Sequence, residues 1–224
     1  LGASTTGCQN VAIGVTAMGA AVTTGNCNVA IGADTLDALT SGYNNVALGY
    51  CALSASTTGN SNIGIGPVAM GAADTTGINN IAIGNQTMDV LTTGLCNVAI
   101  GRNALGASTT GCLNVAIGEL ALGAGVATGI NNIAIGTTTM DALTTGICNV
   151  AIGTNALGAS TTGCLNVAIG NSAMGAADTT GIDNIAIGNS AADALTTGNC
   201  NIVLGFDAFS AATTGCFNIS IGTE

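Results

Sequence analysis

Cysteine is the residue type of this sequence with the widest chemical range, because a thiol can bind a metal, attack as a nucleophile or form a disulfide. The chain has nine cysteines and no histidine among its 224 residues. Metal sites favour Cys-x-x-Cys or mixed Cys and His clusters, and no such spacing occurs here. Disulfides are therefore our main prediction, and small buried free thiols are the alternative.

The cysteines lie in a repeat of 17 or 18 residues, whose positions we number from the first Thr of Thr-Thr-Gly. Three predicted disulfides join position 5 of one repeat to position 4 of the next: Cys96 with Cys112, Cys148 with Cys164, and Cys200 with Cys216. Each would close a loop of about fifteen residues, worth ~3 kcal/mol in the chain-entropy model. Cys8 is expected to pair with Cys27 or with a cysteine of a repeat upstream, and Cys51 is expected to remain unpaired. Disulfides indicate an oxidising, extracellular setting.

Acidic residues offer the other possible chemistry. Asp37, Asp89, Asp141 and Asp193 occupy position 15 of every third repeat. Carboxylates three stacked coils apart, about 14 Å, are too distant to share a calcium ion or to act together as acid and base. Without histidine no Ser-His-Asp or Cys-His arrangement can form, and no phosphate-binding glycine motif is present. The sequence therefore predicts a solvated acidic row, no enzyme, no metal site and no cofactor.

The repeat that positions these side chains occurs thirteen times. Gly stands at position 3, Asn at 6, Val or Ile at 7, usually Ala at 8, Ile or Leu at 9 and Gly at 10, followed by a small apolar tail. The repeats begin 18, 17 and 17 residues apart, so a 52-residue unit is superposed on the single repeat. We predict an all-β chain, a parallel β-solenoid (β-roll) of about thirteen coils, with residues 1–224 forming one repeat array.

Alternation along positions 7 to 9 places the outer two side chains on one face of a strand and the middle one on the other. We expect Val and Ile to fill the coil, the Asn residues at position 6 to form a ladder, and tail residues such as Met18 and Leu53 to point inward. The Ala row at position 8 then becomes a flat self-association face. Its residues are Ala12, Ala30, Ala47, Ala82, Ala99, Ala116, Ala134, Ala151, Ala168 and Ala186.

Two coil sizes fit the pattern: one repeat per coil, or a triangular 52-residue coil with one repeat on each side. Irregular residues at position 11 favour the smaller coil. Arg102 and Glu119 occupy this position in consecutive repeats, and so do Tyr50 and Pro67. Such pairs, like the cysteine pairs, can meet only if each repeat stacks on the next.

Composition restricts the partners. One basic residue against eleven acidic ones gives a net charge of −10, which argues against nucleic-acid binding. No apolar stretch reaches the ~18 residues of a membrane span, so no membrane insertion is expected. Only 5% of residues are charged, against about a quarter in ordinary globular proteins, a composition suited to a fibre or a self-associating surface.

Asn-Val-Ala-Ile-Gly followed by x-x-Ala-Leu, at 97–105 and 114–122, resembles the head repeats of trimeric autotransporter adhesins. With its Thr-Thr-Gly linkers the whole chain is similar to repeat arrays of phage tail fibres and bacterial surface fibres. The resemblance implies a parallel β-roll, often trimeric, in a cell-surface appendage or virion fibre that adheres or acts as a spacer. This chain departs from adhesin heads in its longer repeat and in its cysteines.

These observations favour a non-enzymatic extracellular structural fibre or filament protein that associates with itself, as a trimer or an end-to-end polymer. An adhesive shaft is the role that this hypothesis suggests. A cell-surface receptor or a glycan is the expected external partner, and the chain is expected to be a segment of a longer fibre. The alternative is an ice-binding solenoid. Thr occupies positions 1 and 2 in twelve of the thirteen repeats each, and ranked Thr side chains on a flat face are what ice binding requires.

Overall fold

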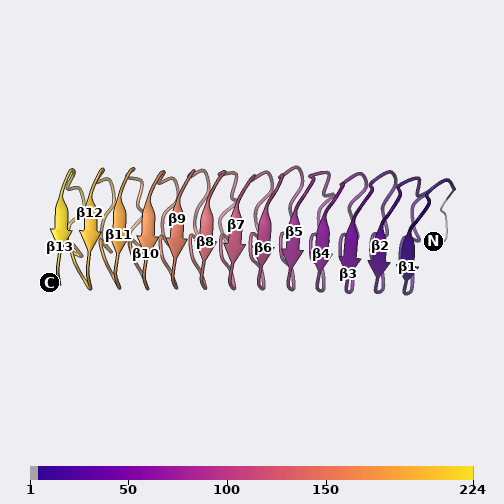
Figure 1. Ribbon diagram of the computed structural model, residues 1–224, viewed down its shortest axis with the longest axis horizontal. Helices are drawn as coiled ribbons and strands as arrows, with labels where there is room; N and C mark the ends of the chain where they lie inside the picture. The colour runs from indigo at the N-terminus through magenta and orange to yellow at the C-terminus, as the bar shows by residue number, and fades with distance from the viewer. Residues whose placement is uncertain (1–4, 224) are drawn as a thin grey trace. The chain divides into compact units, whose positions relative to one another are not determined.

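A computed structural model describes residues 5–223, which contain thirteen three-residue strands and no helix. Figure 1 labels them in chain order, each separated from the next by a returning loop. The strands are β1 (Val11–Ile13), β2 (Val29–Ile31), β3 (Val46–Leu48), β4 (Ile63–Ile65), β5 (Ile81–Ile83), β6 (Val98–Ile100), β7 (Val115–Ile117), β8 (Ile133–Ile135), β9 (Val150–Ile152), β10 (Val167–Ile169), β11 (Ile185–Ile187), β12 (Ile202–Leu204) and β13 (Ile219–Ile221).

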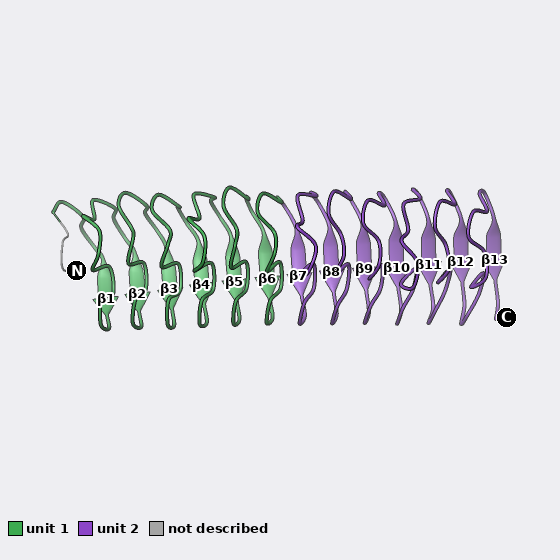
Figure 2. Ribbon diagram, turned by 180° about the vertical axis from the view of Figure 1, so that it is seen from behind, with its two compact units in different colours: residues 1–112 green, residues 113–224 purple. Residues whose placement is uncertain are grey.

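The chain divides into two compact units, coloured separately in Figure 2. Unit 1, Leu1–Cys112, contains β1 to β6, and unit 2, Leu113–Glu224, contains β7 to β13. Within each unit every strand pairs in parallel with the next strand of the chain, in register: Val29 faces Val46 in unit 1, and Val150 faces Val167 in unit 2. One repeat therefore forms one coil. The predicted β-solenoid is confirmed, and the 52-residue triangular coil is excluded.

A glycine ends each strand because the next coil lies against it. Gly153 has a φ of +133°, and a Cβ at this position would lie 2.4 Å from the carbonyl oxygen of Gly170 in the following coil. Only glycine combines this backbone conformation with so close an approach. The invariant Gly at position 10 is thus a requirement of tight stacking as well as of the turn.

The tail of each coil is a series of turns. Positions 5, 12 and 14 adopt left-handed backbone angles in coil after coil; in the coil of β9 these are Cys148 (φ 58°), Asn155 (φ 57°) and Leu157 (φ 49°). Left-handed residues other than glycine are uncommon and carry a strain of about 1 kcal/mol or more. The inter-coil hydrogen bonds of the tail, such as Leu157 N–H to Ala173 O at 3.0 Å, hold this conformation in place.

The core of each coil is narrow. Met18, Leu53, Met88, Leu105 and their equivalents at position 14 are buried, as predicted. The residues that meet them from the strand are the alanines at position 8. At Gly64, the one glycine in this row, a Cβ would lie 3.2 Å from Ala69 O and 3.3 Å from Leu53 Cγ. Beside Leu53 the space between strand and tail therefore fits little more than a methyl group.

The predicted Asn ladder is present in both units. In unit 2 the Oδ1 of Asn149 accepts the backbone N–H of Asn166 at 3.0 Å, and the Nδ2 of Asn149 donates to Gly163 O at 2.7 Å. Asn149 is buried, so these bonds form away from water. Each ladder side chain thus joins two coils and at the same time satisfies the corner formed by the Gly at position 3.

Candidate functional site

The structure reverses the two faces that the sequence suggested. Ala30, Ala47, Ala82, Ala99, Ala116, Ala134, Ala151, Ala168 and Ala186 are fully buried, and Ala12 on the edge strand is half-buried. The prediction of an Ala self-association face, with Val and Ile inside, is therefore wrong. The physical reason is the narrow interior: beside a large tail residue little more than a methyl group fits at position 8, so the large side chains point outward. In β12, Val203 is buried in this row, where the preceding coil carries Ala192 instead of Leu or Met at position 14.

The first and third residues of every strand form what we call the outer Val/Ile face. These side chains remain partly accessible although neighbouring strands pack on both sides of them: in unit 2, Ile133 is 37% exposed, Ile152 38% and Ile187 40%, whereas Ala151 is 0% exposed. No residue of this face is charged. Each unit thus presents an uninterrupted apolar sheet surface, which is rare on a protein that stays monomeric.

All nine cysteines lie within the described residues, and each is a free thiol. The predicted bridges Cys96–Cys112, Cys148–Cys164, Cys200–Cys216 and Cys8–Cys27 are therefore absent from the structure. In-register stacking explains this, because it places position 4 over position 4 and position 5 over position 5. The Sγ of Cys8 accordingly lies 3.2 Å from Oδ1 of Asn26, and the Sγ of Cys27 lies 3.1 Å from Oε1 of Gln9.

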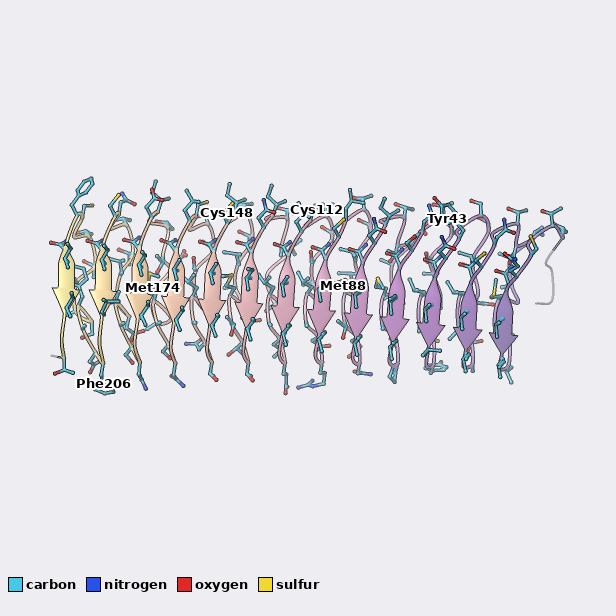
Figure 3. The ribbon with its side chains drawn as sticks, viewed as in Figure 1. Tyr43, Met88, Cys112, Cys148, Met174 and Phe206 are labelled. Atoms are coloured by element: carbon cyan, nitrogen blue, oxygen red, sulfur yellow. The ribbon has the colours of Figure 1, made fainter. Side chains whose placement is uncertain are left out.

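Eight of these cysteines share one corner of the coil, positions 4 and 5, which the Asn at position 6 separates from the strand. We call it the thiol corner. Figure 3 shows Cys112 and Cys148 at this corner of their respective units, and Phe206 at the corner that follows the strands. The ninth cysteine, Cys51, is at position 12, beyond the carboxyl end of β3, and is half-buried.

The two Thr residues that begin each coil have different environments. Thr23 is buried, and its Oγ1 donates to Leu39 O at 3.1 Å. Thr40 is half-buried and donates to Thr57 O at 3.0 Å. The second Thr, such as Thr145, is exposed. A single rank of exposed Thr, which we call the Thr column, therefore remains where the sequence suggested two.

Several Asp carboxylates accept hydrogen bonds from backbone N–H groups of a neighbouring coil. Asp141 accepts the N–H of Ala124 at 2.9 Å, and Asp178 accepts the N–H of Thr161 at 2.8 Å. Asp89 differs, because its Oδ1 is enclosed without a hydrogen-bond partner. Burial raises the pKa of the Asp89 carboxyl. Burial also raises the pKa of Asp141, against the opposing effect of the backbone hydrogen bonds from Ala124 and Gly123.

The stacking pairs at position 11 have different outcomes. Tyr50 and Pro67 occupy the same corner of consecutive coils, where the Val68 N–H donates to Tyr50 O at 2.8 Å. A hydrogen bond and charge from Cys51, together with the charge of Asp34, raise the pKa of the Tyr50 hydroxyl. Arg102 belongs to unit 1 and Glu119 to unit 2, so their contact stays a prediction.

No group of three or more Cys, Asp or Glu side chains among residues 5–223 is placed to hold a metal ion. Across the same residues no helix is long and apolar enough to span a membrane. No protein-family model, curated protein or solved structure matches the chain. The outer Val/Ile face, the thiol corner and the Thr column are therefore the features that bear on function.

A signal for the true orientation of the strand was present in the sequence. Position 8 is Ala or Gly in eleven of the thirteen coils, including Gly64, whereas positions 7 and 9 always carry Val, Ile or Leu. A row restricted to the smallest side chains is typical of a tightly enclosed site. The usual association of β-branched residues with the interior obscured it.

Proposed function

We propose that this chain is a non-enzymatic structural fibre protein that associates with further copies of itself through the outer Val/Ile face. One observation carries the proposal: every strand directs its first and third side chains, all Val, Ile or Leu, outward and its middle side chain inward. An extracellular setting and an adhesive role are part of the same proposal and rest on the likeness to surface-fibre repeats.

A second copy of this chain fits the outer Val/Ile face better than an unrelated surface does. Parallel strands repeat every ~4.8 Å along each unit, so the units of another copy offer rows of side chains with the same spacing. The copies carry a net charge of −10 each, yet none of that charge lies on this face. Repulsion between copies is therefore kept away from the proposed contact.

The available driving force is large enough for stable association. Removing the remaining exposed surface of a half-buried Val or Ile from water contributes about 1 kcal/mol. Unit 2 alone has seven strands with two such residues each. The sum exceeds ~10 kcal/mol before the cost of association, which is of the order of 4–15 kcal/mol.

The test replaces outer Val residues by Thr, which has nearly the same shape but carries a hydroxyl group. In the Val115→Thr/Val150→Thr/Val167→Thr variant of unit 2 we expect the particle mass from light scattering to fall toward that of the 21.3 kDa chain. Far-UV circular dichroism should not change, because Thr is a good strand residue. The matched control, Thr145→Ser/Thr162→Ser/Thr180→Ser, changes three residues of the Thr column and should keep the parent mass. A parent protein that stays monomeric at millimolar concentration would overturn the proposal.

Ice binding is the second candidate, and the Thr column is the observation that favours it. One exposed Thr recurs in nearly every coil at the spacing of the sheet. The Thr→Ser control removes the methyl groups of three of these residues and should lower thermal hysteresis if the column binds ice. No hysteresis from the parent protein at millimolar concentration would exclude this candidate.

A further inference from the structure

Unit 2 carries two pairs of thiols that self-association through the outer Val/Ile face does not itself use. Cys148 and Cys164 lie in the consecutive coils of β9 and β10, and Cys200 and Cys216 lie in those of β12 and β13. The second pair is therefore three coils, or about 14 Å, from the first. Each of the four is half-buried or exposed. Accessible thiols thus recur at a regular interval along one corner.

The hydrogen bonds of the position 4 thiols stay within their own turn or run to position 4 of the preceding coil. The Sγ of Cys164 contacts Thr162 O at 3.3 Å, within its own turn. The Sγ of Cys216 contacts Thr214 O at 3.7 Å and accepts the N–H of Asn199 at 3.3 Å. These contacts direct position 4 sulfur atoms toward their own corner and the residue stacked beneath it. Pairing within the chain would have to disrupt this arrangement.

Exposed apolar residues adjoin the first pair of thiols. Ile147 is 39% exposed and Leu165 51% exposed, and each is adjacent in sequence to a thiol of the first pair. Cys148 precedes Val150 of the outer Val/Ile face by two residues. The thiol corner therefore borders that face, where a second copy would bring its own residues.

We propose that the thiol corner is a covalent cross-linking site, at which disulfides form between copies of this chain. The inference rests on the proposed self-association. The thiol corners of two copies meet when a twofold axis parallel to the strands lies between the two sheets. This rotation turns the outer faces of the two sheets toward each other and leaves the strand direction unchanged, so the amino ends of the strands lie on the same side. The three-coil period is the same in both copies, so a register that joins one pair of thiols also joins the next.

The oxidant is a low-molecular-weight disulfide such as oxidised glutathione. A cysteine thiolate attacks it, forms a mixed disulfide and releases one small thiol. The thiolate of the second copy then attacks the cysteine sulfur of the mixed disulfide and releases the second small thiol. In sum, two protein thiols become one disulfide, the small disulfide becomes two thiols, and the two protons pass through water to those thiols.

The experiment exposes the full chain to a glutathione redox buffer and compares it under reducing and non-reducing conditions. Non-reducing electrophoresis should show covalent dimers and larger species that dithiothreitol removes. Replacing all eight thiol-corner cysteines by Ser should abolish these species, whereas the matched control Cys51→Ser should retain them. Mixing 15N-labelled and unlabelled chains before oxidation should yield disulfide-linked peptides that contain one labelled and one unlabelled partner.

The outcomes separate the two proposals. Multimers in light scattering that run as single chains on non-reducing gels would overturn cross-linking and leave self-association intact. Linked peptides that never mix isotopes would also overturn it, since the bridges would then lie within one chain. A chain that is monomeric with and without reductant would overturn both.

Discussion

The Oδ1 of Asn132 accepts two hydrogen bonds from Asn149 in the next coil, one from the backbone N–H at 3.0 Å and one from Nδ2 at 3.1 Å. Both residues are buried. The ladder is thus a shared network, in which every member is donor and acceptor at once.

Replacing Asn149 by Ala should lower the free energy of unfolding by about 3 kcal/mol, because the N–H of Asn166 and the carbonyl of Gly163 lose their buried partner. Urea unfolding followed by circular dichroism measures the effect. Asn171→Ala is the control, since Asn171 is exposed and its loss should cost less than about 0.5 kcal/mol. Equal midpoints for the two variants would show that the ladder adds no stability.

Ala151 is fully buried in β9, whereas its neighbour Ile152 points outward, so substitutions at the two positions test the orientation of the strand. Ala151→Val adds two carbons to a site enclosed by the tail, and we expect a loss of about 1–3 kcal/mol. Ile152→Val, on the outer Val/Ile face next to it, should cost less than about 1 kcal/mol. Thermal unfolding checks both variants. A loss at Ala151→Val no larger than that at Ile152→Val would contradict the tight enclosure of Ala151.

Val68 is a β-branched residue with a left-handed backbone (φ 58°). The equivalent position in the coils of β6 and β9 is occupied by Asn, which adopts this conformation more readily. Val68→Asn should raise the free energy of unfolding by about 1 kcal/mol, because Asn tolerates this conformation better. Val90→Asn is the control: Val90 is also half-buried but is not left-handed, so no gain is expected. A melting temperature that falls in both variants would contradict the strain argument.

Asp89 should make the stability depend on pH. Its folded-state pKa is raised above the ordinary 3.8, so folding favours its protonated form. Its contribution to stability is complete below the unfolded pKa and is lost as the pH rises through the folded one. We therefore expect the melting temperature of the parent, relative to Asp89→Asn, to rise as the pH falls from 7 toward 4. Asp141→Asn should produce a smaller difference, because the Ala124 N–H already binds that carboxylate. A constant offset between parent and Asp89→Asn across this range would refute the prediction.

The sequence by itself determined the coil. Thirteen repeats with Gly at positions 3 and 10 and Asn at position 6 prescribe where the chain turns and which side chain can bind a corner, because these residues act through local backbone chemistry. The stacking of one repeat on the next followed from the same regularity, and so did the burial of Met18 and Leu53.

Only the tertiary structure decided which way each strand faces. Alternation separates Val150 and Ile152 from Ala151, but it does not say which set lies inside. That choice depends on the distance to the tail: at Gly64, in the same row as Ala151, a Cβ would already lie 3.2 Å from Ala69 O and 3.3 Å from Leu53 Cγ. The tertiary structure also decided the cysteine pairing. Cys148 at position 5 and Cys164 at position 4 do not stack on each other, because equal positions of neighbouring coils lie in register. The spacing of the cysteines in the sequence does not reveal the direction of a side chain at a left-handed residue such as Cys148.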